Sequence, residues 1–219
     1  MAASEALLAQ AEAWAADDPD PATASDLRAL IAGARDGDEA SASELADCFA
    51  GTLEFGTAGL RAALGPGPNR MNLVVVARAA AGLARWLNAN GHAGAKVLIG
   101  YDARYNSDAF ASATAQILAG HGLVPLLTAT RVPTPLVPFG VGRYGCAAGV
   151  VVTASHNPPA DNGYKVYVGR SQIVPPTDSE IAEQIAAASG VSVRELPHGD
   201  AIEIVGDDLI AAYVERAAS

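Results

Sequence analysis

The period of the hydrophobic pattern changes several times along the chain. Residues 72–90 repeat apolar side chains at helical spacing, between Asn72, a residue type that caps helix starts, and Gly91, which commonly ends helices. Residues 96–101 form a mostly apolar run of strand length, which is typical of a strand buried on both faces of a parallel sheet. Helical and strand-like patterns therefore follow one another in this region.

This alternation continues to the end of the sequence. Helices are expected at 107–120 with Ser107 as the cap, in a short segment opened by Thr134-Pro135, at 177–188 with a capping box from Thr177 to Glu180, and at 207–218. Strands are expected at 52–55, 96–101, 123–128, 146–152, 163–168 and 201–205. The pattern predicts a three-layer α/β/α domain with a mixed, mostly parallel sheet.

A different pattern occupies the first fifty residues. Segments 4–16, 26–34 and 43–50 are rich in alanine and have helix-capping residues, with Asp, Pro and Gly between them. We expect a helical extension that precedes the α/β domain.

Composition and charge exclude several classes of protein. The chain has 219 residues, of which 50% are hydrophobic and 17% charged, so it has enough apolar residues for a globular core. The net charge of −10 argues against a nucleic-acid groove, and no apolar run approaches the roughly 20 residues of a membrane span. Residues 1–10 lack a signal-peptide pattern, and Cys48 and Cys146 form no CxxC pair. We therefore expect a cytoplasmic protein with small-molecule partners, and neither nucleic-acid nor membrane binding.

The most informative motif is the sequence TASHNPP at residues 153–159. It places Ser155 on a turn directly after an apolar strand pattern, so that the hydroxyl is presented to solvent. A turn signal at 161–163 and an alternating run then bring the chain back, so that Lys165 approaches the same place. This short region supplies both a nucleophile and a proton carrier.

Other polar residues follow the remaining expected strands. In parallel α/β sheets, ligands bind at the carboxyl ends of the strands. The residues expected there are Thr57, Arg61, Asp102, Arg104, Thr134, Ser155 and His156. Each one alone is more simply explained as part of a loop or an ion pair, but their convergence on one edge indicates a site.

The glycine pattern at 140–145 resembles a dinucleotide-binding fingerprint. Such a fingerprint must follow a strand, whereas this pattern precedes one, and we therefore reject it.

These motifs resemble the α-D-phosphohexomutase family, which includes phosphoglucomutases and phosphomannomutases. In that family a T-x-S-H-N-P loop carries the serine that is phosphorylated, and Ser155 matches it, while NGYK at 162–165 matches a downstream N-G-x-K motif. GTAGLR at 56–61, GYDAR at 100–104 and PTP at 133–135 are similar to further family landmarks in the same order. Residues 55–72 are most similar to the branch of phosphopentomutases and bacterial phosphomannomutases, which also has a helical extension.

The resemblance implies a phosphoglucomutase-type first domain and a mechanism. Phosphoserine at Ser155 would phosphorylate a sugar phosphate, forming a bisphosphorylated intermediate, and net transfer would occur between C1 and C6, or C5 of a pentose. It also implies general acid and base roles for Lys165, assistance from His156, and phosphate or substrate binding by Arg61, Thr57 and Asn157. Mg²⁺ would bind Ser155 through its phosphate, and a hexose 1,6-bisphosphate would act as activator.

The same resemblance implies a domain organisation. Residues 1–50 are expected to be the extension, 51–206 the first domain of the family, and 207–219 the first helix of a truncated second domain. The metal loop, sugar-discriminating loop and carboxy-terminal phosphate-binding domain of the family have no counterpart in the sequence. Two hypotheses remain: the nucleophile-bearing domain of a phosphosugar mutase, completed by remaining domains of the same polypeptide, or a non-catalytic phosphosugar-binding module or inactive fragment.

Overall fold

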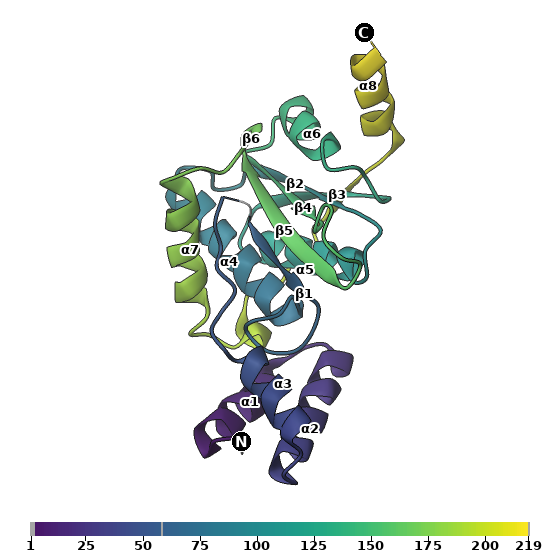
Figure 1. Cartoon of the computed structure of the whole chain (residues 1–219). Helices are drawn as coiled ribbons and strands as arrows, with labels where there is room; N and C mark the ends of the chain where they lie inside the picture. The colour runs from purple at the N-terminus through teal and green to yellow at the C-terminus, as the bar shows by residue number, and fades with distance from the viewer. Residues whose placement is uncertain (1–2, 58, 219) are drawn as a thin grey trace.

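The computed structural model shows a sheet between two helical layers, with a helical extension at one end (Figure 1). The structure describes residues 3–57 and 59–218. The helices of this part are α1 (Glu5–Asp17), α2 (Pro21–Arg35), α3 (Glu39–Cys48), α4 (Leu73–Ala89), α5 (Ser107–Gly120), α6 (Leu136–Tyr144), α7 (Thr177–Ala188), the 3₁₀ helix η1 (Val193–Glu195) and α8 (Asp207–Ala218). The strands are β1 (Leu60–Ala63), β2 (Lys96–Tyr101), β3 (Val124–Thr128), β4 (Ala148–Val152), β5 (Asp161–Val168), β6 (Ser171–Gln172) and β7 (Glu203–Val205).

The sheet is mixed, with a parallel centre and antiparallel strands on one side. Its order is β1-β5-β4-β2-β3-β7, and β6 pairs with β5. Strands β4, β2, β3 and β7 are parallel, whereas β5 is antiparallel to β4 and β1 is antiparallel to β5. The predicted three-layer α/β/α architecture with a mostly parallel sheet is confirmed.

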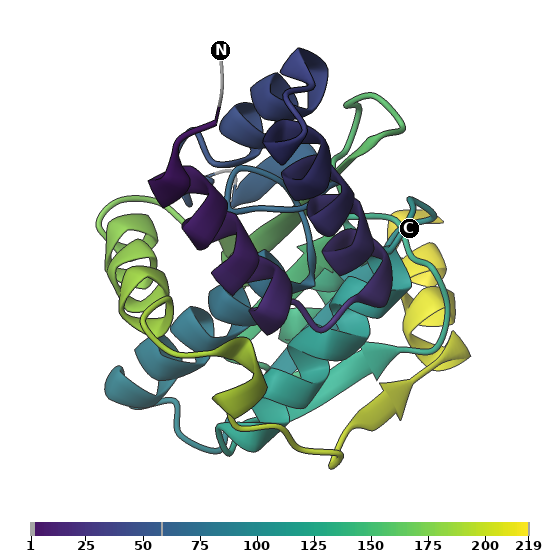
Figure 2. The ribbon, with the colours of Figure 1, turned by 90° about the horizontal axis from the view of Figure 1, so that it is seen from below.

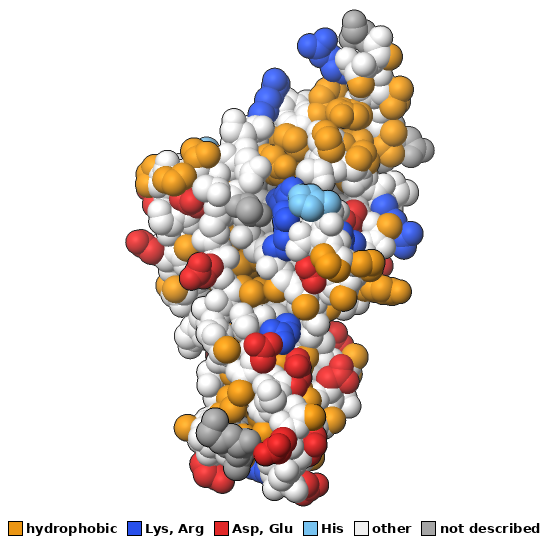
Figure 3. Space-filling model, viewed as in Figure 1, with side chains coloured by type: hydrophobic (Ala, Val, Ile, Leu, Met, Phe, Trp, Pro, Cys, Tyr) orange, Lys and Arg blue, Asp and Glu red, His pale blue; other side chains and the backbone are white. Residues whose placement is uncertain are grey.

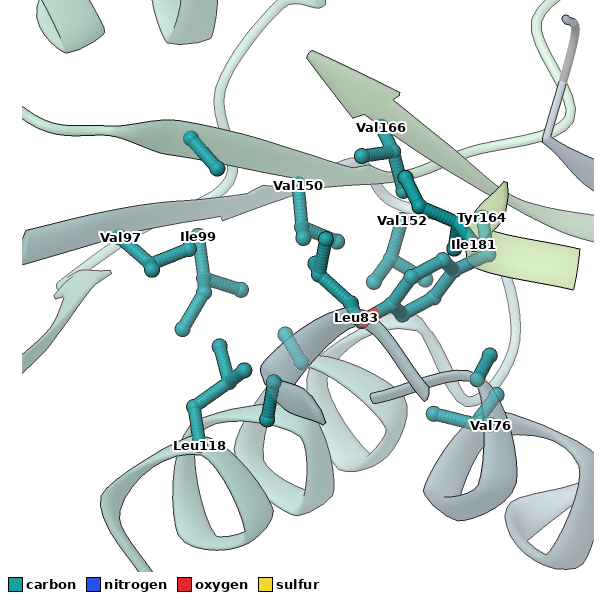
Figure 4. Close-up of a cluster of buried hydrophobic side chains, with 14 of the residues drawn as sticks. Val76, Leu83, Val97, Ile99, Leu118, Val150, Val152, Tyr164, Val166 and Ile181 are labelled. Atoms are coloured by element: carbon teal, nitrogen blue, oxygen red, sulfur yellow. The ribbon is translucent and has the colours of Figure 1, made fainter. Parts of the chain in front are cut away.

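The larger core lies between the sheet and the layer of α4, α5 and α7. Apolar side chains of these helices pack against one face of the strands, and Tyr164 is the largest fully buried side chain there. Figure 4 shows the Tyr164 ring reaching from β5 toward Leu83 of α4 and Ile181 of α7. Because side chains alternate along a strand, Tyr164 and Val166 face this core while Lys165 between them faces the other side.

The opposite face of the sheet is covered by α6 and part of α8. Leu98, Val151 and Tyr167 face this smaller core, and Leu209 of α8 is buried in it. Phe139 of α6 and Tyr213 of α8 form an edge-to-face ring pair with centroids 5.4 Å apart. Helix α8 thus contacts the α/β domain, and its predicted membership in a second domain stays a prediction.

The helical extension is docked on the α/β domain through both apolar and polar contacts. Helices α1–α3 share a buried cluster with α4, α5 and the end of α7, and Figure 2 shows them lying across that side of the domain. Asp17 accepts hydrogen bonds from the Ser192 hydroxyl and the Val193 N–H. The guanidinium of Arg78 lies 4.8 Å above the Trp14 ring and donates to Asp17. The extension is therefore an integral layer of this unit.

Several boundaries and caps differ from the predictions. Residues 52–55 form no strand, because the Leu53 N–H donates to the Pro68 carbonyl, and the edge of β5 is paired with Leu60–Ala63 instead. Ser107 is the first residue of α5 rather than its cap, and its hydroxyl donates to Asp102. Thr177 likewise begins α7 after Pro176, and the Glu180 carboxylate accepts from Trp86 Nε1 at 2.9 Å instead of completing a capping box.

The helices of the extension are longer or earlier than the pattern indicated. Helix α2 begins at Pro21 rather than at residue 26, because the Asp20 carboxylate caps it by accepting from the Ala22 N–H. Helix α3 begins at Glu39 after its cap Asp38, four residues before the expected start.

In the part of the chain that the structure describes, no helix is long and apolar enough to cross a membrane.

Candidate active site

Ser155 occupies a tight turn immediately beyond the carboxyl end of β4. Its φ of 56° lies in the left-handed region, which costs a non-glycine residue about 1–2 kcal/mol. The Thr153 hydroxyl accepts the Ser155 N–H at 2.9 Å, and the Ala154 carbonyl accepts the Asn157 N–H at 3.1 Å. The serine side chain is exposed while Ala154 is fully buried. The chain thus holds the hydroxyl outward in a strained conformation, which is a common feature of functional sites.

This strain gives the first testable prediction. Replacing Ser155 with glycine is expected to stabilise the domain by about 0.5–1 kcal/mol, because glycine adopts a positive φ at little steric cost. Ser155→Ala keeps the strain and is the matched control, with a free energy of unfolding within about 0.5 kcal/mol of the parent chain. Urea unfolding of the three proteins measures the difference. A glycine variant no more stable than the alanine variant would show that the turn is not strained.

Arg61 joins the Ser155 turn to strand β1. Its Nη1 donates to Asn157 Oδ1 at 3.0 Å, and Asn157 Nδ2 donates to Asp161 Oδ2 at 2.8 Å. The sequence pattern predicted that Arg61 lies in a loop after a strand, whereas it lies within β1 opposite Gly163. Asn157 is therefore held between a cation and a carboxylate, which fixes one side of the turn.

Lys165 lies on the same face of the sheet as Arg61. Arg61 pairs with Gly163, and residues two apart on a strand share a face, so the two cations are diagonal neighbours. Lys165 also pairs with Val151 of β4, and the Gly163 carbonyl accepts the Thr153 N–H at 3.0 Å, close to the Ser155 turn. Partial burial, and secondly the charge of Arg61, lower the pKa of Lys165 below 10.5.

A close backbone contact holds β1 beside Lys165. Gly59 has a φ of 74°, and a Cβ built on it would lie 1.9 Å from the Tyr164 carbonyl oxygen. Only glycine allows β1 to begin at this distance from β5. The glycine of this motif thus lets Arg61 reach its position opposite Gly163.

His156 and Thr57 are less closely tied to this cluster. His156 is exposed directly after Ser155. Thr57 is exposed in the turn bounded by Gly56 and Gly59, and its carbonyl accepts a hydrogen bond from the Gln172 side chain. Ala58 of the same motif lies outside the described residues. Figure 3 shows Lys and Arg side chains gathered beside a histidine near the middle of the molecule.

Arg104 makes the densest set of contacts with the Ser155 turn. Its Nη1 donates to the carbonyls of Pro158 and Asp161 at 2.7 and 2.9 Å, and its Nη2 to those of Ser155 and Asn157 at 3.0 and 2.8 Å. The sequence pattern placed it only among the polar residues expected at the carboxyl ends of the strands. The position of Arg104 after a strand in the sequence did not indicate that it would donate four hydrogen bonds to the Ser155 turn.

A hydrogen-bonded network supports Arg104 from below. Asp102 lies 3.5 Å from its Nε and accepts the Ser107 hydroxyl at 2.8 Å. The buried Asn162 side chain donates to that hydroxyl and to the Tyr105 carbonyl, at 3.0 and 2.8 Å. The loop after β2 and the start of β5 are thereby joined beneath the turn.

Comparison with known proteins places this arrangement in a family. Residues 52–191 match the model of the phosphoglucomutase/phosphomannomutase alpha/beta/alpha domain I. The chain belongs to this phosphohexomutase family. The matched range includes β1 with Arg61, the loop with Arg104, the Ser155 turn and Lys165, so all of the site described above lies in domain I.

Individual relatives agree with the family assignment. The chain is 42% identical over 153 residues to a probable phosphomannomutase of Haemophilus influenzae, covering 68% of this chain and 31% of the relative. It is 38% identical over 182 residues to human phosphopentomutase, covering 78% of this chain and 29% of the relative. The crystal structure named "putative phosphomannomutase" from Thermus thermophilus aligns with a TM-score of 0.60 and 32% identity, covering 75% of this chain and 35% of that one. The chain thus spans about a third or less of the length of these phosphohexomutase relatives.

The charge distribution explains how a net negative phosphohexomutase chain can present a cationic site. Residues 1–50 contain eleven acidic and two basic residues, whereas residues 51–219 contain thirteen acidic and twelve basic ones. Figure 3 shows acidic side chains over the lower part of the molecule, where the extension lies, and basic ones near its middle. Because exposed charges are screened beyond about 8 Å at physiological salt, acidic residues farther than that from Ser155 have little influence on the field there.

The resemblance also implies a magnesium ion, for which the site offers few ligands. In the part of the chain that the structure describes, no group of three or more His, Cys, Asp and Glu side chains is arranged to hold a metal. Asp102 is engaged by Ser107 and Arg104. The residues present therefore do not form a metal site by themselves, and they offer the exposed Ser155 oxygen as one ligand.

Proposed function

We propose that this chain is the nucleophile-bearing domain of a phosphosugar mutase, with Ser155 as the carrier of the phosphoryl group. The observation that supports the proposal most strongly is the exposed Ser155 hydroxyl on a clamped, positive-φ turn, with two cations on the adjoining sheet face. A phosphoryl group carries close to two negative charges at neutral pH, and fixed cations stabilise it during transfer. Arg61 and Lys165 are the cations proposed for this role, which is supported by their position on one face of the sheet.

The proposed transfer is a displacement at phosphorus. The bond between phosphorus and the Ser155 oxygen breaks, and a bond forms between phosphorus and a hydroxyl oxygen of a sugar monophosphate. The neutral amine of Lys165 accepts the proton of that hydroxyl, and the released serine oxygen takes a proton from water. The bisphosphorylated sugar then turns over, and its other phosphoryl group passes to Ser155, whose hydroxyl gives its proton back to water. The Lys165 ammonium returns a proton to the departing sugar oxygen. No atom is gained or lost over the cycle, and phosphate has moved between two hydroxyls.

Supporting roles follow from position. Arg61 is the proposed ligand of the phosphoryl oxygens, because a planar guanidinium suits phosphate recognition. Exposed His156 and the turn residue Thr57 are proposed contacts to phosphate, with His156 assisting proton transfer, and Asn157 orients Arg61 through its 3.0 Å hydrogen bond. Relatives named phosphomannomutase, phosphopentomutase and phosphoglucomutase support a hexose or pentose monophosphate as substrate class. We also propose that the chain acts with further domains of a longer polypeptide, called the complete polypeptide below, with Mg²⁺ and a hexose 1,6-bisphosphate activator as its cofactors.

The alternative function is phosphosugar binding without turnover by this chain alone. The small coverage of the relatives and the incomplete set of metal ligands in the described residues favour it for the chain as given. We therefore expect the 219-residue chain to turn over sugar phosphates at least about 10³-fold more slowly than the complete polypeptide, because the loss of several kcal/mol of charge stabilisation has that effect. A coupled mutase assay on both proteins measures this ratio. Comparable turnover would contradict the assignment of the chain as one part of the active site.

Peptide mass analysis tests the proposed carrier. The complete polypeptide is incubated with a hexose 1,6-bisphosphate and Mg²⁺, digested and analysed for phosphate on the peptide that contains Ser155. One phosphate is expected on that peptide in the parent protein and none in Ser155→Ala. An active protein whose Ser155 peptide never acquires phosphate would leave only the binding-module hypothesis.

A further inference from the structure

Arg104 collects backbone carbonyls that all belong to the segment carrying Ser155. Four carbonyls of residues 155–161 accept from its two terminal nitrogens at 2.7 to 3.0 Å. Hydrogen bonds to a charged donor are stronger than those between neutral groups, and their convergence on one planar group fixes direction as well as distance. The side chain is only 14% exposed, so its position is set by the protein rather than by solvent.

The direction of these carbonyls determines which backbone N–H groups face away from Arg104. In a planar trans peptide the carbonyl and the following N–H point in opposite directions. The Ser155 carbonyl points to Arg104, so the His156 N–H points away from it. Pro158 and Pro159 have no N–H, and the His156 N–H has no protein acceptor among residues 3–57 and 59–218. Arg104 therefore gathers the negative ends of the peptide dipoles on one side and leaves a free donor directed to the other.

This arrangement bears on a phosphorylated Ser155. A phosphoryl group with close to two negative charges is repelled by nearby carbonyl oxygens and stabilised by free N–H donors. If the guanidinium is removed, the four peptide groups lose their common partner and can rotate toward the phosphate. The turn at φ 56° then loses four of its contacts and keeps the bonds to the Thr153 hydroxyl and the Ala154 carbonyl.

We propose that Arg104 is a positioning residue for phosphoryl transfer, acting through the backbone of the Ser155 turn and without touching the sugar. This inference rests on the proposed function of Ser155. It distinguishes Arg104 from Arg61, whose proposed role is direct contact with the phosphoryl group. Loss of Arg104 should therefore lower the maximal rate of phosphorylation of Ser155 and leave the affinity for the phosphoryl donor nearly unchanged.

A solvent-open depression makes chemical rescue possible. Arg104 lines a cavity of about 600 Å³ together with Asp102, Tyr105, Asn157 and Pro159, and Tyr105 is 74% exposed at its edge. In Arg104→Ala, free guanidinium ion can enter through this depression and reach the same four carbonyls. Methylammonium carries the same charge without the planar fork, so it is the control compound.

The experiment follows Ser155 phosphorylation over time by quenched peptide mass analysis in the complete polypeptide with hexose 1,6-bisphosphate and Mg²⁺. Arg104→Ala is expected to lower the maximal rate by about 10²-fold with the half-saturating concentration within about threefold of the parent value. Arg104→Lys should recover less than about a tenth of the parent rate, because an ammonium cannot hold four carbonyls in one plane. Arg35→Ala removes an exposed arginine of the extension and is expected to leave the rate unchanged.

The outcomes separate this inference from the proposed function. Millimolar guanidinium should restore part of the rate in Arg104→Ala, and methylammonium should not. A parent protein that acquires no phosphate on Ser155 overturns both proposals. A phosphorylated parent with an equally fast Arg104→Ala, or a loss confined to the half-saturating concentration, overturns only the role of Arg104. If Arg104→Ala does not fold, as judged by its thermal transition, Arg104→Lys decides in its place, and a parent-like maximal rate overturns the role.

Discussion

Ser155→Ala is expected to lower mutase turnover of the complete polypeptide by about 10⁴-fold or more, because removal of a covalent nucleophile eliminates the only route through a phosphoenzyme. The structure gives a reason to expect that this substitution removes activity without disturbing the turn. The Ser155 side chain is exposed and lies outside the hydrogen bonds that hold the turn, while its backbone N–H bonds Thr153 in either variant. The alanine variant should therefore keep the turn and lose only the reacting oxygen. Steady-state turnover in a coupled assay measures the effect.

Thr153→Val is a useful companion variant. It removes the hydroxyl that accepts the Ser155 N–H at 2.9 Å and leaves the Ser155 oxygen in place. Its turnover is expected to fall by about 10-fold, the effect of losing one hydrogen bond that holds the turn.

A Ser155→Ala variant that keeps more than about a tenth of parental turnover would contradict the covalent route, since such residual activity exceeds what nucleophile removal leaves.

Replacing Lys165 with arginine is expected to lower the rate of the first transfer, from phosphoserine to sugar, by about 10²–10⁴-fold. Arginine keeps the positive charge but does not deprotonate at any pH where the protein is folded, so it cannot accept the sugar proton. Binding of the sugar phosphate should change little, because the charge remains. Lys165→Met removes both charge and proton transfer and should weaken binding as well. Single-turnover rates at several sugar phosphate concentrations separate the two effects.

The pH dependence of the same step tests the assignment independently. Burial and the neighbouring Arg61 lower the pKa of Lys165, and the reactive form is the neutral amine. The single-turnover rate should therefore rise with pH through that lowered pKa and level off above it. Arg61→Gln removes one of the two causes, so the pKa of Lys165 rises and the rising limb moves to higher pH. A limb that moves to lower pH, or persists unchanged in Lys165→Arg, would exclude Lys165 as the base.

The strongest parts of the fold were predictable because their signals are local. Helix α4 lies between Asn72, whose side chain accepts the Val75 N–H at 3.0 Å, and Gly91, as the pattern predicted. Helix α7 has the predicted bounds. Strands β2 and β4 were also recognisable, since a strand buried on both faces has few polar interruptions.

The missed features depend on contacts between distant segments. Strand β1 has only four residues, and its pairing is set by the close approach of Gly59 to Tyr164, which no local pattern shows. The positive φ of Ser155 also has no signal, because serine rarely adopts it and the surrounding contacts impose it. Arg104 reaches carbonyls 51 to 57 positions away, so its role became visible only in three dimensions.

The site was predictable as a set of residues and less so as a geometry. The motif predicted a nucleophile and a nearby amine, and the strand register puts Lys165 and Arg61 on one face beside the Ser155 turn. The register could not be read from the sequence, because a shift of one residue would place Lys165 in the core and Tyr164 outside. Burial of Tyr164 against α4 and α7 fixes this choice.

The central claim is that Ser155 transfers its phosphoryl group to the sugar during each turnover. Its most direct test is to purify the complete polypeptide with radiolabelled phosphate on Ser155, mix it with excess sugar monophosphate and stop the reaction at millisecond intervals. The label is predicted to leave the protein and appear in sugar bisphosphate at least as fast as steady-state turnover. Label that stays on Ser155 while turnover proceeds would contradict the claim.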